Sequence, residues 1–597
     1  VPLELQWTFD LRVSREDLWP RLSNTSEVNR RMGLDPMNLD ERGGHLHGEI
    51  KVGITHMVWE ELPWTWIYPS ELAYVRLYSR GPARVIRTRT RLEARGPDET
   101  RVHAYVGMVP RNGLMRFALN MGMRGFEARY GRVLTEFEAE IRGEAARAKA
   151  PVNSLLTPAG QAKLDQVRAA LLDADKGPGI APAVVEALVD HVASAPDDEL
   201  DRLRPLELAR LWSQEPDEVV RACLHATRRG LLTLTWDVVC PHCRGVRDTL
   251  EHLGDVKPRG DCEVCDIDFD TSERETLEVS FHVHPSVRKV EKRLYCAAEP
   301  ATKAHVKVQQ DLDAGQRRPL ELVLAPGAYR FRVRGDRAFA RLVVDEEGGE
   351  EGSAELRASE PTGELHMGPS TPLALVNDLG EAGTLVVEEA ESDRDALRPV
   401  QVFGLQDYRD LFDEEALAIG LRLDVGIQTV MFTDVVSSTR FYLDAGDTVA
   451  FSEVRQHFVI AFDVVRRHGG IVVKTIGDAI MASFADPADA VAASIAMQRR
   501  FGSDHAESKL RIRITLHTGP CLAVNLNTGV DYFGTTVNLA AKIQSAADAG
   551  QVAFTEQTWN DPGVRSLLAE KGLAPAEIDF EFRQAEQSIK LYRIDVE

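Results

Sequence analysis

The pattern of apolar and polar positions in the first quarter of the chain predicts a sheet followed by a helix. Apolar residues alternate with polar ones over residues 3–11, which is typical of a half-buried strand. Ser14 then begins a helix, with an acidic residue three positions later. Further strand-like runs include 45–60 and 84–108, and a long helix is predicted over about 112–142.

The middle of the chain changes pattern three times. Residues 146–182 predict a helical connector. From 183 to about 236, short stretches with helical apolar spacing run into a strand, an order that predicts a small winged-helix-like unit. Residues 272–395 alternate with period two between acidic, Gly-containing turns, which predicts a β-sandwich. Residues 396–424 predict a short amphipathic helix that links this region to the next.

The last third of the chain, residues 425–597, predicts strands and helices in a ferredoxin-like βαββαβ order. An apolar strand at 427–434 leads into a helix. Residues 471–484 predict two strands joined across a turn at Gly477-Asp478, and a second helix and strand follow. In this order the first strand and the hairpin can be neighbours in one sheet.

Two carboxylates stand at strand ends in this region, and three hydroxyl groups follow the first of them. Asp434 ends a strand where a helix begins, beside the free N–H groups and positive dipole that favour phosphate. Asp478 faces Asp434 if the two strands are neighbours. Two acids and a helix start suit a pair of Mg²⁺ ions and a triphosphate. For either acid alone, a helix cap or a turn residue is the simpler interpretation. The hydroxyl groups belong to Ser437, Ser438 and Thr439.

Three motifs taken together resemble the catalytic domain of the class III nucleotidyl cyclases, the adenylate and guanylate cyclase family. They are FTDVVSST, KTIGDAIMASF and DYFGTTVNLAAK, in this order within about residues 425–595. The resemblance implies two Mg²⁺ or Mn²⁺ ions per active site, with Asp434 and Asp478 as ligands and Val435 in the same metal-binding segment. It implies further that substrate is bound by Ser437, Ser438, Thr439, Lys474 and Asp531, and that Asn538 orients the ribose.

Lys474 and Asp531 match the pair that reads the purine in this family. A lysine donor beside a carboxylate acceptor implies adenine, because guanine presents the opposite edge pattern.

Two positions depart from the family. Lys542 stands where an arginine usually stabilises the transferring phosphate, and the loss of the planar fork could cost about 1–3 kcal/mol. Ser437 stands where a glycine is common. Both changes imply reduced activity, although both metal acids are present.

The implied reaction is attack of the ribose 3′-hydroxyl of ATP on the α-phosphate, which yields 3′,5′-cyclic AMP and pyrophosphate. Because the active sites of this family form between two catalytic domains, a homodimer with two equivalent sites is expected. The upstream domains would then sense a signal or regulate the enzyme. One alternative is a cyclase for another nucleotide, GTP or a pyrimidine. A second is a weak or inactive nucleotide-binding regulator, for which Lys542 is the only support.

Four cysteines form a second chemical motif within residues 183–271. Two C-x-x-C pairs, eighteen residues apart, offer four thiolates at the spacing of a zinc ribbon, which predicts one structural Zn²⁺. Reduced cysteines without a metal are the simpler alternative. The winged-helix-like unit and the ribbon together resemble an uncharacterised module that accompanies some bacterial class III cyclases. The four ligands would be Cys240, Cys243, Cys262 and Cys265.

Residues 1–145 resemble the helix-grip, START-like fold, on the order of their elements and not on a motif. Five of the eight tryptophans of the chain fall in this segment, and they could line a pocket for an apolar ligand. Ordinary core and surface positions are the simpler interpretation. These tryptophans are Trp7, Trp19, Trp59, Trp64 and Trp66.

Composition narrows the partners of the protein. The 597 residues suffice for several domains, and the formal net charge of −22 argues against nucleic acid and anionic membrane surfaces as partners. No apolar run reaches the length of a transmembrane helix, and the first residues do not resemble a signal peptide. Seven cysteines, four of them clustered, fit a reducing compartment, so a cytoplasmic location is expected.

Overall fold

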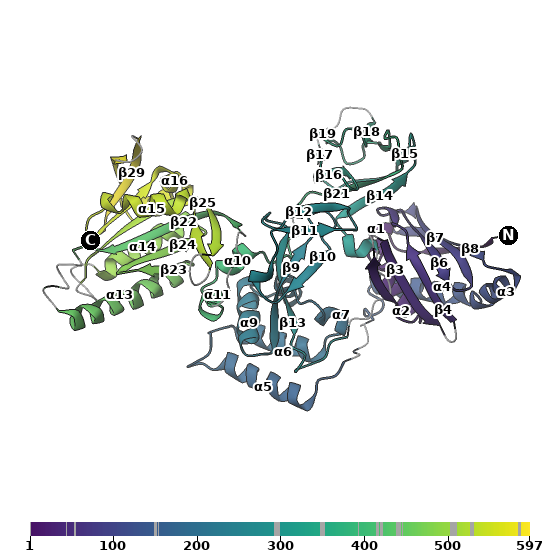
Figure 1. Ribbon diagram of the computed structural model, residues 1–597, viewed down its shortest axis with the longest axis horizontal. Helices are drawn as coiled ribbons and strands as arrows, with labels where there is room; N and C mark the ends of the chain where they lie inside the picture. The colour runs from purple at the N-terminus through teal and green to yellow at the C-terminus, as the bar shows by residue number, and fades with distance from the viewer. Residues whose placement is uncertain are drawn as a thin grey trace.

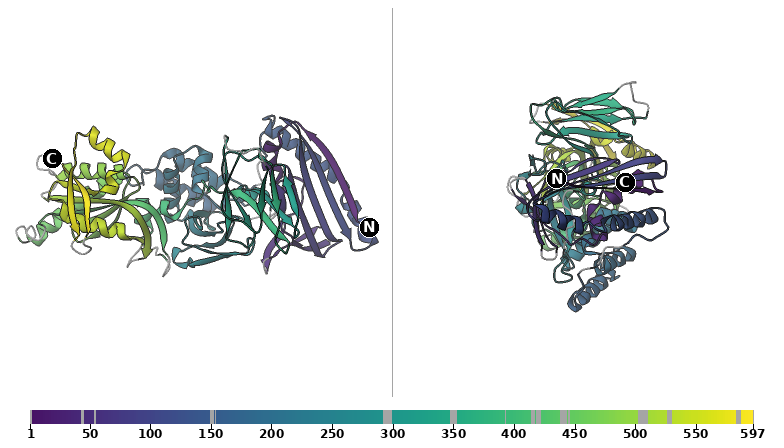
Figure 2. Two further views of the ribbon diagram at one scale, coloured as in Figure 1. Left: turned by 90° about the horizontal axis from the view of Figure 1, so that it is seen from above. Right: turned by 90° about the vertical axis from the view of Figure 1, so that its right-hand side faces the viewer.

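The computed structural model shows an elongated arrangement in which the two ends of the chain form separate bodies (Figures 1 and 2). Helices and a small sheet lie between these two bodies. No helix in the described part of the chain is both long enough and apolar enough to cross a bilayer. The structure describes the chain except residues 1, 43–44, 53–54, 149–151, 153, 292–298, 347–352, 392, 414–416, 418–421, 438–442, 444–445, 502–509, 526–529, 583–586 and 597.

The N-terminal body is a curved antiparallel sheet against which helices pack. Strand β1 alternates between exposed and covered residues, as the sequence predicts, and pairs with β8. The Ser14 hydroxyl accepts a hydrogen bond from the Asp17 amide at 3.0 Å, which confirms the predicted helix start. The elements are β1 (Leu3–Leu11), α1 (Arg15–Leu22), α2 (Thr25–Arg31), β2 (Asn38–Arg42), β3 (His45–Val52), β4 (Thr55–Glu61), β5 (Thr65–Ile67), β6 (Glu71–Arg80), β7 (Ala83–Gly96), β8 (Glu99–Pro110), α3 (Gly113–Gly122) and α4 (Phe126–Ile141).

The single long helix expected over 112–142 is wrong, because the chain forms two helices there. Gly125, at the start of α4, has a φ of 78°, a left-handed conformation that interrupts a right-handed helix. Helix α4 buries Tyr130, Val133, Leu134 and Phe137 against the sheet, whereas α3 buries none of its residues. The order of strands and helices matches the expected one, and the START-like assignment stays a prediction.

The tryptophans of this body are mostly core residues. Trp59, Trp64 and Trp66 are at most 1% exposed. The indole N–H groups of Trp59 and Trp64 donate to the two oxygens of Glu61, at 2.8 and 2.9 Å. Trp66 donates to the carbonyl oxygen of Val306 at 2.9 Å. These contacts favour the core interpretation over an apolar ligand pocket.

The region expected to form a β-sandwich contributes strands to two sheets, and the larger of these is continuous with the N-terminal sheet. Strand β14 pairs with β5, which joins the two regions in one thirteen-stranded sheet. A second, three-stranded sheet covers the apolar face of this region's strands in the larger sheet. The strands are β14 (Val306–Leu312), β15 (Arg317–Leu320), β16 (Gly327–Val333), β17 (Phe339–Val344), β18 (Ala354–Arg357), β19 (Glu364–Met367), β20 (Leu373–Val376) and β21 (Gly383–Glu389).

The segment between the two bodies, residues 158–290, is called here the cysteine-bearing module. Its helices pack with one sheet, and Thr157 caps the first helix through the Gly160 amide at 2.9 Å. The helix expected in a connector therefore belongs to the core of the module. The elements are α5 (Pro158–Leu172), α6 (Pro182–Ser194), α7 (Asp197–Leu200), α8 (Pro205–Trp212), α9 (Pro216–Arg228), β9 (Leu232–Val239), β10 (Val246–Leu250), β11 (Arg259–Cys262), β12 (Ile267–Asp270) and β13 (Leu277–Val283), with a 3₁₀ turn at Leu253–Asp255.

Strand β13 differs from the sequence-based expectation, which placed it at the start of the β-sandwich. It pairs antiparallel with β9, and the sheet order is β10-β9-β13. All of its residues are buried except His282, which is half-buried. Alternation along a strand indicates that it is a strand but does not identify its partner, so the sequence alone could not assign it to this sheet.

The C-terminal body confirms the predicted βαββαβ order. Its sheet runs β23-β24-β22-β25-β27-β29-β28, so the first strand and the hairpin are neighbours. Helices α13, α14 and α17 cover one face. The elements are β22 (Leu423–Val435), α13 (Asp447–Arg467), β23 (Ile471–Ile476), β24 (Ala479–Phe484), α14 (Pro487–Phe501), β25 (Ile512–Asn525), β26 (Val530–Phe533), α15 (Thr535–Lys542), β27 (Gln551–Thr555), α16 (Glu556–Trp559), α17 (Pro562–Glu570), β28 (Ala576–Phe582) and β29 (Gln587–Asp595), with a 3₁₀ turn at Ile543–Ala546.

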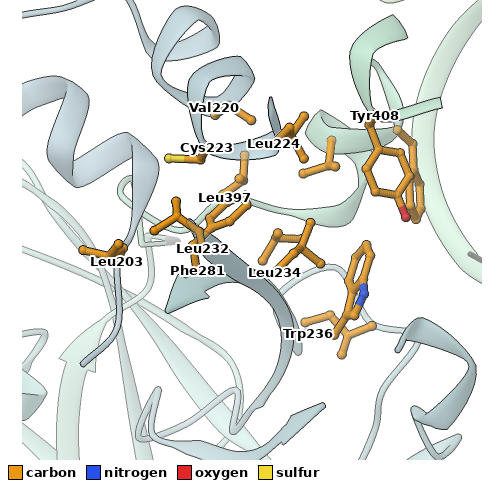
Figure 3. Close-up of a cluster of buried hydrophobic side chains, with 14 of the residues drawn as sticks. Leu203, Val220, Cys223, Leu224, Leu232, Leu234, Trp236, Phe281, Leu397 and Tyr408 are labelled. Carbon is orange, nitrogen blue, oxygen red and sulfur yellow. The ribbon is translucent and has the colours of Figure 1, made fainter. Parts of the chain in front are cut away.

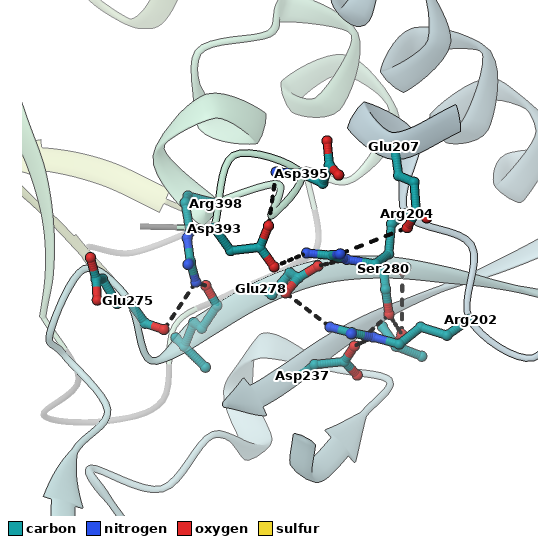
Figure 4. A network of polar contacts seen from close by, with 12 residues as sticks. Arg202, Arg204, Glu207, Asp237, Glu275, Glu278, Ser280, Asp393, Asp395 and Arg398 are labelled. Carbon is teal, nitrogen blue, oxygen red and sulfur yellow. Dashed lines mark hydrogen bonds and ion pairs between the residues drawn. The ribbon is translucent and has the colours of Figure 1, made fainter. Parts of the chain in front are cut away.

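Two short helices, α10 (Pro399–Phe403) and α11 (Gln406–Leu411), lie between the module and the C-terminal body. The chain entering α10 is fixed to the module by a partly buried polar network (Figure 4). The Arg204 guanidinium donates to Glu278 at 2.7 Å and to Asp393 at 2.6 Å. The Arg398 guanidinium donates to the carbonyl oxygens of Glu275 and Leu277, at 3.0 and 3.1 Å.

Replacing Arg204 tests how strongly this network holds the chain. Glu278 is 3% exposed, so Arg204→Ala leaves a buried carboxylate whose remaining ion pair among the described residues is with Arg202. We expect the free energy of unfolding of the module to fall by about 3 kcal/mol, measured by urea unfolding followed by tryptophan fluorescence. The matched control is Arg210→Ala, because Arg210 is 67% exposed in its ion pair with Asp395 and should contribute less than about 1 kcal/mol. Equal losses in the two variants would contradict the prediction.

Candidate functional site

The two acids predicted at strand ends lie at the same end of adjacent strands. Strand β22 pairs antiparallel with β24, and the last paired residues are Thr433 and Ile480. Asp434 follows the first of these residues, and Asp478 lies in the turn that precedes β24. The Thr433 hydroxyl accepts a hydrogen bond from the Ile480 amide at 3.2 Å, which fixes the two strand ends to each other.

Asp434 also has a basic neighbour on the other side of its strand. Strand β25 pairs with β22 so that Arg513 lies directly across from Asp434. The Arg513 guanidinium donates from Nε to Asp434 Oδ2 at 2.8 Å, and its Nη2 donates to the same oxygen. A cation bound to Asp434 therefore shares this carboxylate with a guanidinium.

Asp478 provides a test of whether this corner suits a metal ion. Its Oδ2 atom is buried and has no hydrogen-bond partner among the described residues. A buried carboxylate oxygen without a donor is costly unless a cation is near. The donor set also fits, since Mg²⁺ prefers oxygen ligands from one or two carboxylates. The two acids thus fit a divalent cation.

A buried histidine lies behind the turn that carries Asp478. His457 on α13 is fully buried, and burial lowers its pKa to about 4, against a smaller opposing effect of the Asp478 backbone. The ring therefore stays neutral at physiological pH. It adds no positive charge behind the two acids.

The turn after β22 contains an unusual backbone conformation. Ser437 has a φ of 59°, in the left-handed region that disfavours residues with a side chain by about 1–2 kcal/mol. Glycine adopts this conformation without that cost, which gives a physical reason for a glycine preference in such a turn. Ser438 and Thr439 lie outside the described residues.

Lys474 and Asp531 are brought together although they are 57 residues apart. The Lys474 ammonium lies 2.5 Å from Asp531 Oδ2. Lys474 is on β23 and is 38% exposed, whereas the Asp531 side chain on β26 is 10% exposed. The second oxygen, Oδ1, accepts a hydrogen bond from the Tyr532 amide at 2.8 Å. The pair therefore presents a fixed acceptor beside a more accessible donor.

Asn538 and Lys542 lie on α15, which begins after β26. They are four residues apart, so they share one face of the helix, and both are exposed. Lys542 is the last residue of α15. Both side chains are therefore accessible from solvent.

The four predicted zinc ligands converge in the cysteine-bearing module. The sulfur atoms of Cys240, Cys243, Cys262 and Cys265 all lie within 4.8 Å of one another, and all four residues are buried. Cys243 Sγ and Cys262 Sγ are 3.8 Å apart. Four buried thiols at such distances match the tetrahedral donor set of a structural zinc site.

The turns of the two cysteine pairs share one backbone feature but differ in their hydrogen bonds. The residue after each second cysteine adopts a left-handed conformation, with φ of 57° at both Arg244 and Asp266. In the first turn the Arg244 amide donates to the Cys240 carbonyl at 2.9 Å, and in the second the Cys265 amide donates to the Cys262 carbonyl at 3.2 Å. The pairs come from two hairpins, one between β9 and β10 and the other between β11 and β12.

Sequence reasoning missed Arg513 and His457. Arg513 could have been found from the strand at 510–518, because an antiparallel neighbour of β22 places one of its residues opposite Asp434. His457 has no such signal, since a histidine on an amphipathic helix is usually an ordinary core or surface residue. Arg409 and Gln406 of α11, which contact the strands of the Lys474–Asp531 pair, were missed as well.

Two family models match the chain. Residues 425–567 match the adenylate and guanylate cyclase catalytic domain. Residues 168–305 match a family of unknown function, DUF5939, which covers most of the cysteine-bearing module.

Curated relatives are similar to a minor part of this chain. A receptor-type adenylate cyclase, GRESAG 4.1 of Trypanosoma brucei brucei, is 26% identical over 172 residues, covering 22% of this chain and 14% of the relative. A receptor-type adenylate cyclase of Trypanosoma congolense is 26% identical over 209 residues, which cover 28% of this chain and 27% of the relative. An uncharacterized protein of Mycobacterium tuberculosis is 41% identical over 95 residues, which cover 16% of this chain and 24% of the relative. The chain thus spans only a small part of the length of these relatives.

Solved structures of cyclase domains are also similar to part of this chain. An adenylate cyclase of Trypanosoma brucei in its monomeric state has 25% identity and a TM-score of 0.25, covering 29% of this chain and 88% of that one. The guanylate cyclase domain of RhGC from Catenaria anguillulae, in complex with GTP, has 22% identity and a TM-score of 0.25. The match covers 29% of this chain and 98% of that one. Because both TM-scores are low, these likenesses support no argument. The match over residues 425–567 shows that this part of the C-terminal body is similar to the adenylate and guanylate cyclase catalytic domain.

Proposed function

We propose that the protein is an adenylate cyclase that converts ATP to 3′,5′-cyclic AMP and pyrophosphate. The 3′-hydroxyl oxygen of the ribose forms a bond to the α-phosphorus, and the bond from that phosphorus to the pyrophosphate oxygen breaks. The observation that carries this proposal is the Lys474–Asp531 pair, held at 2.5 Å in a domain that also presents Asp434 and Asp478 at one sheet end.

The choice of ATP follows from the hydrogen-bonding groups of this pair. Adenine presents an acceptor nitrogen beside an amino donor, whereas guanine presents a donor beside a carbonyl acceptor. Lys474 can donate to the acceptor of adenine, and Asp531 can accept from its amino group. The Tyr532 amide donates to Asp531 Oδ1 and orients the carboxylate, and Oδ2 faces the Lys474 ammonium, so donor and acceptor lie side by side for the base.

Asp434 and Asp478 would hold two Mg²⁺ or Mn²⁺ ions, together with the backbone at Val435. When bound, these ions would supply Lewis-acid charge that favours the attacking hydroxyl and the departing pyrophosphate. Arg513 keeps one oxygen of Asp434 oriented, and Ser437 begins the turn that would receive the triphosphate. The roles of Ser438 and Thr439 in that turn stay predictions.

The active unit proposed here is a homodimer. The Asn538 amide and the Lys542 ammonium face outward from α15, where they could reach a substrate held by the acids of a second copy. Two large apolar residues beside the base-reading pair are also open to solvent, Ile476 at 49% and Phe533 at 52% exposed. An interface across these residues would cover both.

The cysteine cluster would hold one structural Zn²⁺, and the upstream domains would regulate the cyclase in signal transduction. Four protein ligands would leave the metal no open position for chemistry. Thiols kept free for a metal fit a reducing cytoplasm, where ATP is also found.

A second candidate function is a nucleotide-binding regulator with little activity. Two observations favour it: Lys542 replaces the usual arginine, and Asp434 is shared with Arg513. A cyclase for another nucleotide is the alternative within the same class.

A product assay on the full-length protein distinguishes these functions. An equimolar mixture of ATP, GTP, CTP and UTP with Mn²⁺ should give cyclic AMP as the main product, read by mass spectrometry. Asp434→Asn and Asp478→Asn should each lower the rate by at least about a hundredfold, because each variant removes a metal-binding charge.

The matched control for this assay is Asp579→Asn. Asp579 is an exposed carboxylate on β28, at the opposite edge of the sheet from β23, and its variant should keep the wild-type rate. Circular dichroism establishes that all variants are folded. Another cyclic nucleotide as the main product would overturn the base assignment, and bound nucleotide without any product would favour the regulator.

Lys542→Arg tests the departure from the family. The guanidinium restores planar, bidentate contact to a phosphate, so we expect kcat to be preserved or to rise by up to about tenfold, with little change in KM. Steady-state rates of cyclic AMP formation measure both constants. A large fall in kcat would show that the site has adapted to a lysine.

Metal analysis tests the proposed zinc site without relying on activity. The purified protein should contain about one zinc per chain by inductively coupled plasma mass spectrometry, and Cys262→Ser should lose the zinc and unfold at a lower temperature. Cys521→Ser is the control, because Cys521 is also buried but lies in the catalytic domain. Wild-type protein without zinc, or zinc retained in Cys262→Ser, would contradict the prediction.

A further inference from the structure

Helix α11 has two faces that contact different parts of the molecule. Successive residues of a helix are rotated by about 100°, so Gln406 and Arg409 share one side and Asp407 and Tyr408 share the opposite side. The first side contacts the catalytic domain, and the second contacts the cysteine-bearing module. These contacts place α11 between the module and the two strands that carry the base-reading pair.

The module side of α11 is an apolar and ionic contact. Tyr408 is 2% exposed, and its ring centroid lies 6.3 Å from that of Trp236 (Figure 3). The ring of Phe403 on α10 is also near, with its centroid 5.7 Å from that of Tyr408. Asp407 accepts from Arg221 Nε at 3.0 Å and is 2.6 Å from His225 Nε2, both on α9. The two hydrogen bonds lower the Asp407 pKa to about 2, against the opposing effect of burial, which is the larger single contribution.

On the catalytic side, Gln406 contacts the strand of Lys474. Its Oε1 atom accepts a hydrogen bond from the Val472 amide at 2.9 Å. Strand β23 is the edge strand of the sheet, and its pairing with β24 shifts by one residue between Val472 and Lys474. A bulge re-aims the side chain that follows it. Gln406 therefore holds the edge strand at the irregularity that directs Lys474.

Arg409 contacts both neighbours of Asp531. Its Nη1 atom donates to the Val530 carbonyl oxygen at 3.0 Å, and its guanidinium carbon lies 5.2 Å from the centroid of the Tyr532 ring. Tyr532 is 2% exposed, and burial raises its pKa. Strand β26 has only four residues and pairs with β25, so these contacts support it from its other side.

We infer that Gln406 and Arg409 are positioning residues for base recognition, and that α11 makes this recognition depend on the cysteine-bearing module. The inference rests on the proposed cyclase function and extends it. Lys474 and Asp531 lie on separate strands, so their 2.5 Å contact depends on where β23 and β26 are held. Both strands are held by one turn of α11, which is itself bound to α9. A displacement of α9 thereby changes the spacing of the pair that reads adenine.

The test compares two substrates that differ only at the group read by Asp531. Full-length protein is assayed with ATP and with purine riboside triphosphate, which lacks the 6-amino group. In Arg409→Ala and in Gln406→Ala, KM for ATP should rise by about tenfold and kcat should change by less than about threefold, which corresponds to one weakened hydrogen bond. The preference for ATP over the analogue should fall by a similar factor.

Three further variants sharpen the test. Arg394→Ala removes a guanidinium that is 83% exposed and should leave both constants unchanged. Arg409→Lys keeps the cation over Tyr532 and should recover part of the preference. Asp407→Ala, which alters only the module side, should lower the preference in the same direction by about twofold.

The outcomes separate this inference from the proposed function. If the wild type forms cyclic AMP and folded Arg409→Ala and Gln406→Ala keep its preference for ATP over the analogue, the inference is overturned and the function stands. A fall in kcat at constant preference overturns it too, because that result indicates a merely structural role. If the wild type forms no product, calorimetric Kd values for ATP and the analogue in the same variants replace the kinetics. Absence of ATP binding overturns both.

Discussion

The antiparallel register between β22 and β24 is the constraint on which the candidate site depends. It places Asp434 and Asp478 at one end of the sheet, and a slip by one residue would turn one of them to the opposite face. The same central strand pairs with β25, which brings Arg513 to Asp434. Buried residues on both faces of β22 fix this register from above and below.

The core beneath the catalytic sheet is continuous with the core of the cysteine-bearing module. One cluster of buried side chains runs from the helices of the module through Phe403 and Tyr408 to Phe432 and Tyr532. The opposite face of the sheet has its own core, closed by α13, α14 and α17. One face of the C-terminal sheet is therefore covered by helices of the same body, whereas the other face is covered by residues that precede it in the chain.

Much of the catalytic domain could be predicted from the sequence, because its motifs combine local periodicity with turn residues. The hairpin at Gly477-Asp478 and the pairing of distant Lys474 and Asp531 are examples, the second through a family resemblance. The partner of β13, the union of the two N-terminal sheets and the contacts of α11 could not be predicted. Each depends on which surfaces meet in three dimensions, and neither alternation nor helical spacing specifies a partner. The break at Gly125 was missed because the flanking residues continue a helical pattern.

The pairing of β14 with β5 has a consequence for dissecting the chain. A fragment that begins after residue 145 would keep β14 and its partner β21 but lose β5, and the N–H and C=O groups on that side of β14 would be left unpaired. Such an edge favours association with other chains, so this fragment should aggregate for a reason unrelated to its own core. A cut in the segment between β21 and β22 divides no sheet, but it divides the core that the module shares with the C-terminal sheet.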